Sequence, residues 1–280
     1  MRKRRLVRKQ ILIYLAAVGI VLYSVLPITW LVGTSFKSQA EILQGGRTFL
    51  PSTWTLTNYT DVLLKSEYGL YFVNSLVVTL AATSIVMVCA ILSGYSFSGM
   101  FRYPEKNAIM IVIILARMVP EIAIVIPMYF YLQWAGLYDT RAGIALVIAA
   151  LAYPLATWLM KSFFDDIPES LYEAAKLDGC NSWDILRRIV LPISGPSISS
   201  TLIITFLTVW NSFLIPLTFA KTARSKTFPV AISELAFGEF GVSWGTLSAL
   251  SVMAVIPMFL IGVFAQKYIV AGLTSGAEKG

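Results

Sequence analysis

The sequence predicts an all-α membrane protein with six transmembrane helices. Of the 280 residues, 57% are hydrophobic and only 13% are charged, whereas a soluble domain usually carries about 25% charged residues. A large core does not account for this deficit, because the surface around a core must still be wet. The apolar residues also gather in six segments, each close to the length of about 20 helical residues that crosses a bilayer. The bilayer is therefore the expected solvent of this chain.

The six segments define the predicted domain organisation. The predicted spans are residues 11–32, 72–92, 108–132, 142–160, 197–219 and 246–265. They form one transmembrane domain, residues 11–270, between a basic N-terminus at 1–10 and a polar tail at 271–280. The basic run before the first span is also found in signal peptides, but this span is too long for a signal-peptide core and no cleavage site follows it. We expect it to remain as an uncleaved first helix.

The distribution of Lys and Arg predicts the orientation of these helices. If both termini are cytoplasmic, 14 of the 22 basic residues lie on the cytoplasmic side and seven on the outer side, with Arg117 inside a span. Basic residues accumulate in cytoplasmic loops. The sequence therefore predicts a multi-pass protein of the inner or plasma membrane with both termini in the cytoplasm.

Several kinds of chemistry are not expected from this chain. It contains no histidine, the usual neutral-pH general base, and its two cysteines do not have the spacing of a zinc site. It also contains no G-x-x-x-x-G-K-[ST] phosphate loop. We expect no catalytic residue, no metal and no bound cofactor, so the chain is not predicted to be an enzyme.

The cytoplasmic segment at 161–195 begins with a predicted short helix. The acidic pair at 165–166 followed by Pro168 is typical of a helix start. Leu171, Ala174, Ala175 and Leu177 give this helix a small apolar face, and Gly179 is expected to end it.

A second short helix is predicted to follow the first. Asn181 or Ser182 can cap it, and Trp183, Leu186 and Ile189 recur every three residues. Pro192 is expected to break it. The segment is thus a helix–turn–helix with an apolar patch, which either docks another protein or packs on the cytoplasmic ends of its own bundle. The residues leave both readings open.

One motif in this segment resembles a known family. Glu173-Ala174-Ala175, three residues, Gly179, nine residues, Ile189, one residue and Leu191-Pro192 match the EAA loop of binding-protein-dependent ABC importer permeases. The resemblance implies the transmembrane domain of a type I ABC importer, in which this loop docks on a separate ATPase subunit. The implied coupling residues are Glu173, Ala174, Ala175, Asp178, Gly179, Trp183, Ile189, Leu191 and Pro192.

Other stretches resemble the carbohydrate permeases of the maltose-permease type, especially the smaller of their two membrane subunits. These stretches are Thr57-Asn58-Tyr59, Asn74-Ser75-Leu76, Gly94-Tyr95-Ser96-Phe97, Ile126-Pro127-Met128-Tyr129, Ile167-Pro168, Trp210-Asn211-Ser212-Phe213 and Gly272 to Ala277. The resemblance implies import of a sugar, or of a related polyol or glycerol phosphate. It implies as partners a second permease, two ATPase subunits that hold ATP and Mg²⁺, and an extracytoplasmic binding protein. It also implies that the C-terminal tail enters the interface of the ATPases.

Arg117 and Glu121 are the charged residues expected inside a span. They are four residues apart, so one helix face is expected to carry both. Charges at membrane depth are costly and usually face a bundle interior or a wet cavity. The pair is predicted either to lock helices together or to line the translocation path. If it coupled ions, the chain would be a self-sufficient secondary transporter, which is the alternative function.

Trp210 and Asn211, near the middle of the fifth span, are candidates for contact with substrate. An indole face and an amide suit the C–H faces and hydroxyls of a sugar, although interhelical packing is the simpler role. Tyr153 and Tyr129 are weaker candidates of the same kind.

Overall fold

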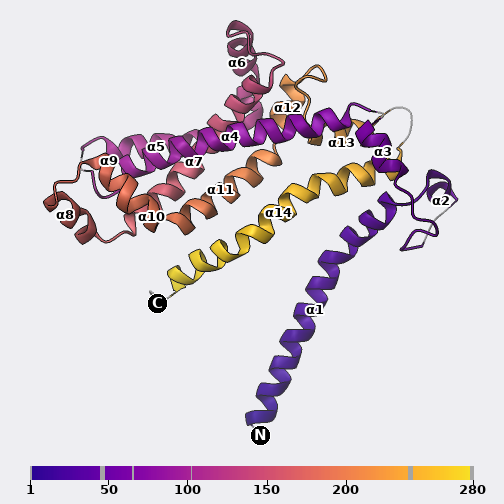
Figure 1. Ribbon diagram of the computed structural model, residues 1–280, viewed down its shortest axis with the longest axis horizontal. Coiled ribbons are helices and arrows are strands. Elements are labelled where there is room, and N and C mark those ends of the chain that lie inside the picture. Colours follow the sequence, from indigo (N-terminus) through magenta and orange to yellow (C-terminus); the bar gives the residue numbers. More distant parts are fainter. Residues whose placement is uncertain (1, 45–47, 65, 102, 239–241, 278–280) are drawn as a thin grey trace. The chain divides into compact units, whose positions relative to one another are not determined.

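The computed structural model describes the chain apart from residues 1, 45–47, 65, 102, 239–241 and 278–280. The described residues form helices and no strand, which confirms the all-α prediction. The helices are α1 (Arg2–Ser35), α2 (Gln39–Leu43), α3 (Thr57–Leu64), α4 (Tyr68–Phe97), α5 (Lys106–Ala116), α6 (Glu121–Trp134), α7 (Arg141–Asp165), α8 (Glu169–Leu177), α9 (Ser182–Ile185), α10 (Leu191–Ile193), α11 (Gly195–Trp210), α12 (Leu214–Phe219), α13 (Phe228–Ala236) and α14 (Trp244–Ala277) (Figure 1). A π-helical turn, η1 (Leu186–Val190), joins α9 to α10.

Among the described residues, five helical stretches are long and apolar enough to cross a membrane. The pair α5 and α6, bent by 96°, makes a sixth if it counts as one broken span. The prediction that residues 108–132 form one helix is therefore wrong. Pro120 has an extended backbone (φ −60°, ψ 136°) and lies between the two helices. Proline donates no backbone hydrogen bond and disfavours the helical conformation of the residue before it, which explains the break.

The ends of the last two spans also differ from the sequence-based expectation. The α-helix of the fifth span stops at Trp210 and resumes at Leu214, so Asn211 lies at a break instead of inside a helix. The last helix continues to Ala277, so the tail predicted at 271–280 begins as a helix. Its final residues, 278–280, lie outside the described part of the chain.

The chain divides into two compact units, residues 1–69 with 232–256 and residues 70–231 with 257–280. In the second unit α7 is the central helix, since it packs against α5, α11 and α12. It also crosses α4 closely, because a Cβ added at Gly94 would lie only 2.7 Å from the Cβ of Met160. Figure 1 shows α8 and α9 together at one end of α4 and α7.

In the first unit a buried lysine organises the loop after α1. Lys37 is 1% exposed, and its ammonium group donates to the carbonyl of Thr48 and lies 5.0 Å from the ring centre of Trp30. Asn58 of α3 donates to the carbonyls of Ser35 and Lys37 at 2.9 and 2.8 Å. These bonds satisfy backbone groups that would otherwise be unpaired, so the loop is a folded part of this unit.

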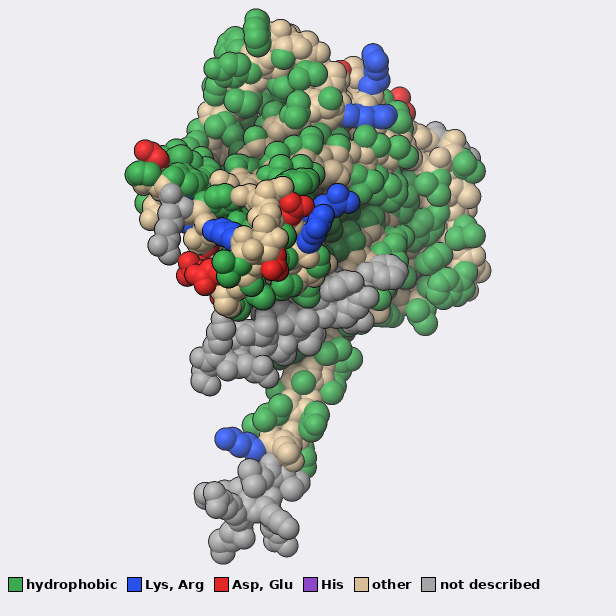
Figure 2. Space-filling view, turned by 60° about the vertical axis from the view of Figure 1, so that its left-hand side comes forward, with side chains coloured by type: hydrophobic (Ala, Val, Ile, Leu, Met, Phe, Trp, Pro, Cys, Tyr) green, Lys and Arg blue, Asp and Glu red, His purple; other side chains and the backbone are tan. Residues whose placement is uncertain are grey.

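Apolar side chains cover much of the surface. No residue in the apolar stretch with which α1 could cross a membrane is buried, whereas 44% of the residues in the corresponding stretch of α4 are buried. Figure 2 shows hydrophobic side chains over most of the visible face, with charges in small groups. Exposed apolar area of this extent marks a membrane or protein contact, which agrees with the predicted class of membrane protein.

Candidate functional site

The segment between α7 and α11 contains the residues of the motif. Helix α8 begins at Glu169, directly after Pro168, and places Glu169 where the positive end of the helix dipole favours an acidic side chain. It ends at a glycine with φ +79°, Gly179. The N–H of Gly179 donates to the carbonyl of Lys176 and that of Cys180 to the carbonyl of Ala175. This is the Schellman cap, which requires a residue tolerant of positive φ.

Helix α9 is capped by Asn181, one of the two predicted caps. Its side-chain oxygen accepts from the N–H groups of Trp183 and Asp184 at 2.9 and 3.0 Å. An Asn at this position satisfies two of the donors that the first turn of a helix leaves open. The turn between α8 and α9 is thus fixed at both sides, by Gly179 and by Asn181.

One face of this segment packs on the rest of its own unit. The buried side chains of this face are Tyr172, Ala175, Ile185, Leu186 and Val190. Tyr172 also donates to the carbonyl of Phe164 in α7 at 3.3 Å. Burial raises the pKa of Tyr172 to about 12, so its hydroxyl remains a donor at physiological pH.

The opposite face is open. Leu177 is 89% exposed and Trp183 is 60% exposed, and Glu173, Ala174 and Asp178 are exposed as well. Large apolar side chains in such positions indicate a contact with another molecule. The packing on its own bundle that the sequence left open thus holds for one face of the segment, and the other face remains open. We call the segment from Glu169 to Leu191 the coupling segment, after the role that the resemblance predicts for it.

The three apolar residues of the predicted second helix differ in exposure. Leu186 is buried beside Ile185 and Ile189 is half-buried, whereas Trp183 is exposed. A spacing of three residues follows one face only in an undistorted helix, and the π-helical turn η1 lies within this stretch.

Pro192 does not break the helix. The N–H of Leu191 donates to the carbonyl of Leu186, five residues back, and Pro192 then lies in the first turn of α10. A proline is tolerated in a first turn because the N–H groups of that turn have no acceptor within the helix, so the missing N–H removes no helical hydrogen bond. The chain leaves helical geometry only briefly at Ser194 before α11 begins.

Three of the six predicted pathway residues line a cavity of about 750 Å³ in the second unit. Arg117, Glu121 and Asn211 line it, together with residues of α7 such as Pro154. Arg117 follows the last residue of α5 and Glu121 begins α6, so the bend separates them, and the structure gives no ion pair between these two described residues. The prediction that one helix face carries both is therefore wrong, while the two residues do meet a common cavity.

The aromatic candidates lie elsewhere. Trp210 is 3% exposed, with its ring stacked on Phe206 at 6.0 Å and edge-on to Phe72 at 5.9 Å. Tyr129 contacts the ring of Tyr138 at 5.1 Å, and neither it nor Tyr153 belongs to the lining of the large cavity. Trp210 thus packs within the unit, whereas its polar neighbour Asn211 reaches the cavity.

Sequence reasoning missed Asp139, which organises the loop after α12. Its carboxylate accepts from the backbone N–H groups of Lys221 and Thr222 at 2.8 and 3.1 Å, and from the hydroxyls of Thr222 and Ser225. Burial raises the pKa of Asp139, but these hydrogen bonds outweigh burial and lower it to about 2. The signal was faint, since an Asp in a turn is common and its partners are more than 80 residues away.

Comparison with known proteins identifies the family. Residues 88–275 match the family described as binding-protein-dependent transport system inner membrane component. The chain is 31% identical over 92% of its length to the trehalose transport system permease protein SugB of Mycobacterium tuberculosis (strain CDC 1551 / Oshkosh), covering 93% of that protein. It is 30% identical over 99% of its length to the trehalose/maltose transport system permease protein MalG of Thermococcus litoralis, covering 99% of it.

A solved structure supports the fold. A chain of a bacterial ABC transporter involved in the import of the acidic polysaccharide alginate superposes with a TM-score of 0.80 at 22% identity, over 93% of this chain and 96% of that one. Together with the coupling segment and the broken membrane helices, these matches lead to one conclusion. The chain belongs to the binding-protein-dependent inner-membrane transport components, as a member of the group of sugar ABC importer permeases.

Proposed function

We propose that this chain is the membrane subunit of an ATP-driven sugar importer, in which the coupling segment docks on a separate ATPase subunit. ATP binding would close the ATPases, draw the docked segments together and open the path to the outside. Such a cycle works because ATP stabilises one of two conformations more than the other. The orientation that this requires is the predicted one, with the coupling segment in the cytoplasm.

The two faces of the coupling segment carry this proposal. Its buried face, with Tyr172 and Val190, fixes it to its own unit, and its open face presents Leu177 and Trp183. An exposed aromatic anchor with apolar neighbours is typical of an interface hot spot. A segment that is rigidly attached on one side and apolar on the other suits the transfer of force between two proteins.

Leu177→Asp tests the docking. The side chain is 89% exposed, so the substitution should leave folding unchanged while it places a charge in an apolar interface. We expect co-purification of the ATPase subunit to fall at least tenfold, roughly the effect of losing one hot-spot residue. Leu64→Asp is the matched control, since Leu64 also ends a short helix and is 80% exposed. Equal ATPase recovery from both variants would contradict the proposed docking.

The substrate and the other partners follow from the relatives. Two relatives are named for trehalose or maltose and a third, NgcG of Streptomyces coelicolor, for diacetylchitobiose, which supports a disaccharide or small oligosaccharide as cargo. A solved relative was crystallised with a pentasaccharide-bound periplasmic protein, which supports an extracytoplasmic binding protein as partner. We further propose a second permease and two ATPase subunits that hold ATP and Mg²⁺, with the C-terminal tail of this chain at the ATPase interface.

The cavity beside the bend is the proposed contribution of this subunit to the sugar path. Arg117, Glu121 and Asn211 offer it hydrogen-bond donors and acceptors, and polar groups within a membrane usually mark such a path. The alternative of a secondary transporter has less support, because Arg117 and Glu121, its proposed coupling pair, form no ion pair with each other. The chain also belongs to a family of ABC importer permeases.

Exchanging the charges of Arg117 and Glu121 distinguishes two roles for these residues, as lining of the sugar path and as a structural pair. If Arg117 and Glu121 act independently, Arg117→Glu should lower sugar uptake roughly tenfold, about 1.4 kcal/mol in the transport barrier. The double variant Arg117→Glu/Glu121→Arg should then be no better than the poorer single variant. Uptake at the unmodified level in the double variant, with normal assembly, would instead show that the two residues serve only as a pair.

A further inference from the structure

Tyr95 links a membrane helix to the coupling segment. It lies near the C-terminal end of α4 and is buried, and its hydroxyl donates to the backbone carbonyl of Ser182 at 2.9 Å. Ser182 is the first residue of α9. The hydrogen bond therefore joins the side chain of a long helix to the backbone of the segment, independently of the apolar contacts between them.

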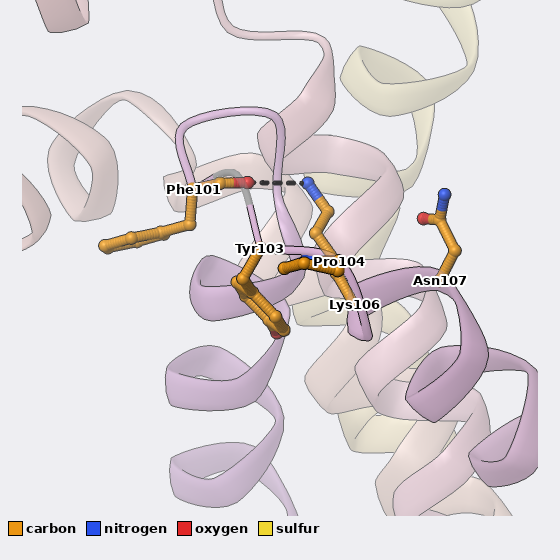
Figure 3. Close-up of a pocket in the computed structure, with 5 residues that line it drawn as sticks. All are labelled: Phe101, Tyr103, Pro104, Lys106 and Asn107. Atoms are coloured by element: carbon orange, nitrogen blue, oxygen red, sulfur yellow. Dashed lines mark hydrogen bonds between the residues drawn. The ribbon is translucent and has the colours of Figure 1, made fainter.

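The ring of Tyr95 is held from two sides. It lies edge-on to Phe101 at 5.2 Å and to Phe164 of α7 at 6.3 Å. Phe101 belongs to the loop between α4 and α5. Lys106 closes this loop by donating to the carbonyl of Phe101 (Figure 3) and to that of Ser98. The ammonium group of Lys106 thus satisfies carbonyls at the end of α4, where a cation is favoured, and this loop fixes the position of the phenol.

The acceptor is close to the open face of the segment. Ser182 directly precedes Trp183, the exposed aromatic residue, and both belong to the turn that Asn181 caps. The carbonyl of Ser182 also accepts from the N–H of Leu186 at the end of α9. Because Ser182 and Trp183 are adjacent in one hydrogen-bonded turn, a displacement of Trp183 by a docked partner would also displace the carbonyl that Tyr95 holds.

We propose that Tyr95 is a positioning residue that transmits the displacement of α9 to α4 during the transport cycle. The proposal rests on the proposed function, because it assumes that the open face of the coupling segment meets an ATPase. It assigns the phenol hydroxyl a role separate from that of the ring, which packs in the core. Removal of the hydroxyl alone should therefore leave the fold and the docking intact and weaken the transmission.

Tyr95→Phe tests the link in the purified chain without any partner. Hydrogen exchange of the Leu186 amide, which donates to this carbonyl and to that of Trp183, should be roughly fivefold faster, the change expected when the segment loses one ordinary hydrogen bond. Tyr59→Phe is the matched control, since it removes another bonded phenol hydroxyl, 2.7 Å from the hydroxyl of Ser35 in the other unit. Unchanged exchange at Leu186 in Tyr95→Phe would overturn the link, whatever the chain transports.

A second measurement tests the transmission in the assembled complex. The native cysteines are first removed by Cys89→Ala and Cys180→Ala, and Asn211→Cys then places a single thiol in the cavity. The rate at which a water-soluble maleimide modifies this thiol is measured with and without ATP and Mg²⁺. We expect the ATP-dependent change in this rate to be several-fold smaller with Tyr95→Phe than with Tyr59→Phe, at equal ATPase co-purification. An equal change in both, or loss of the ATPase with Tyr95→Phe, would overturn the proposal. Absence of any ATP-dependent change in the complex with Tyr95 would instead overturn the proposed function.

Discussion

Gly94→Val is expected to prevent the close packing of α4 on α7 and to destabilise the core of the second unit. A Cβ at this position would lie 2.7 Å from the Cβ of Met160 and 3.0 Å from the backbone nitrogen of Lys161. Since one of these neighbours is backbone, the helices themselves must separate. Small residues at helix crossings in membranes permit such close approach, and overpacking of this kind costs on the order of 3 kcal/mol.

The thermal unfolding of the purified chain in detergent measures this effect. A loss on the order of 3 kcal/mol should lower the midpoint by roughly 10 °C. Gly262→Val in α14 is the matched control, because among the described residues no atom beyond its chain neighbours and its own helix backbone lies within 4 Å of an added Cβ there. If the midpoints of the two variants were the same, the crossing of α4 and α7 would not be as close as the structure has it.

Asp139→Asn is expected to open the loop that follows α12. The carboxylate accepts four hydrogen bonds from Lys221, Thr222 and Ser225, and Asp139 has a positive φ of 55°. Asparagine tolerates this backbone conformation but has one acceptor oxygen and no charge. Hydrogen bonds to a charged group contribute about 2 kcal/mol each, so local opening should become at least 30-fold more frequent.

Limited trypsin digestion measures the opening, because the loop contains Lys221 and Arg224, both exposed. Cleavage after these residues should accelerate in Asp139→Asn. Cleavage after Arg187 and Arg188 in the coupling segment provides a control within the same molecule and should be unchanged. Equal acceleration at both places would mean that the variant had unfolded globally.

The stabilisation from Asp139 should also depend on pH. Its pKa is lowered from 3.8 to about 2 in the folded loop, so the charged form is favoured by folding. The stabilisation is present above pH 4 and is lost as the pH falls from about 4 to about 2. Hydrogen exchange of the Lys221 and Thr222 amides, corrected for intrinsic rates, should reveal this loss, and Asp139→Asn should not show it.

The sequence predicted the membrane class, the end of α8 and the start of α9 because these depend on composition and on local chemistry. Gly179 supplies a positive φ and Asn181 a capping oxygen, each within a few residues of its partners. Such signals do not require knowledge of the distant parts of the chain.

The bend at Pro120 could not be predicted in the same way. Pro27, Pro127, Pro154 and Pro257 lie inside helices of this chain, and membrane helices tolerate proline because neighbouring groups satisfy the freed carbonyls. Whether a proline bends or breaks a helix therefore depends on its surroundings. The same holds for Trp210, whose burial depends on Phe72, a residue 138 positions earlier in the chain.

The π-helical turn at Leu186–Val190 has a consequence for how this part of the chain can vary. Each residue of an α-helix adds about 100° of rotation, and the turn contains one residue more than an α-helical turn would. The π-helical turn absorbs this extra residue, so α9, with Trp183, keeps nearly the orientation relative to α10 that a regular helix one residue shorter would give it. Loss of a residue within the turn would restore a regular helix and leave the outward face almost unchanged. Loss of a residue in α9 between Trp183 and the turn would instead rotate Trp183 by about 100° relative to α10. A change in chain length is therefore better tolerated within the turn than beside it.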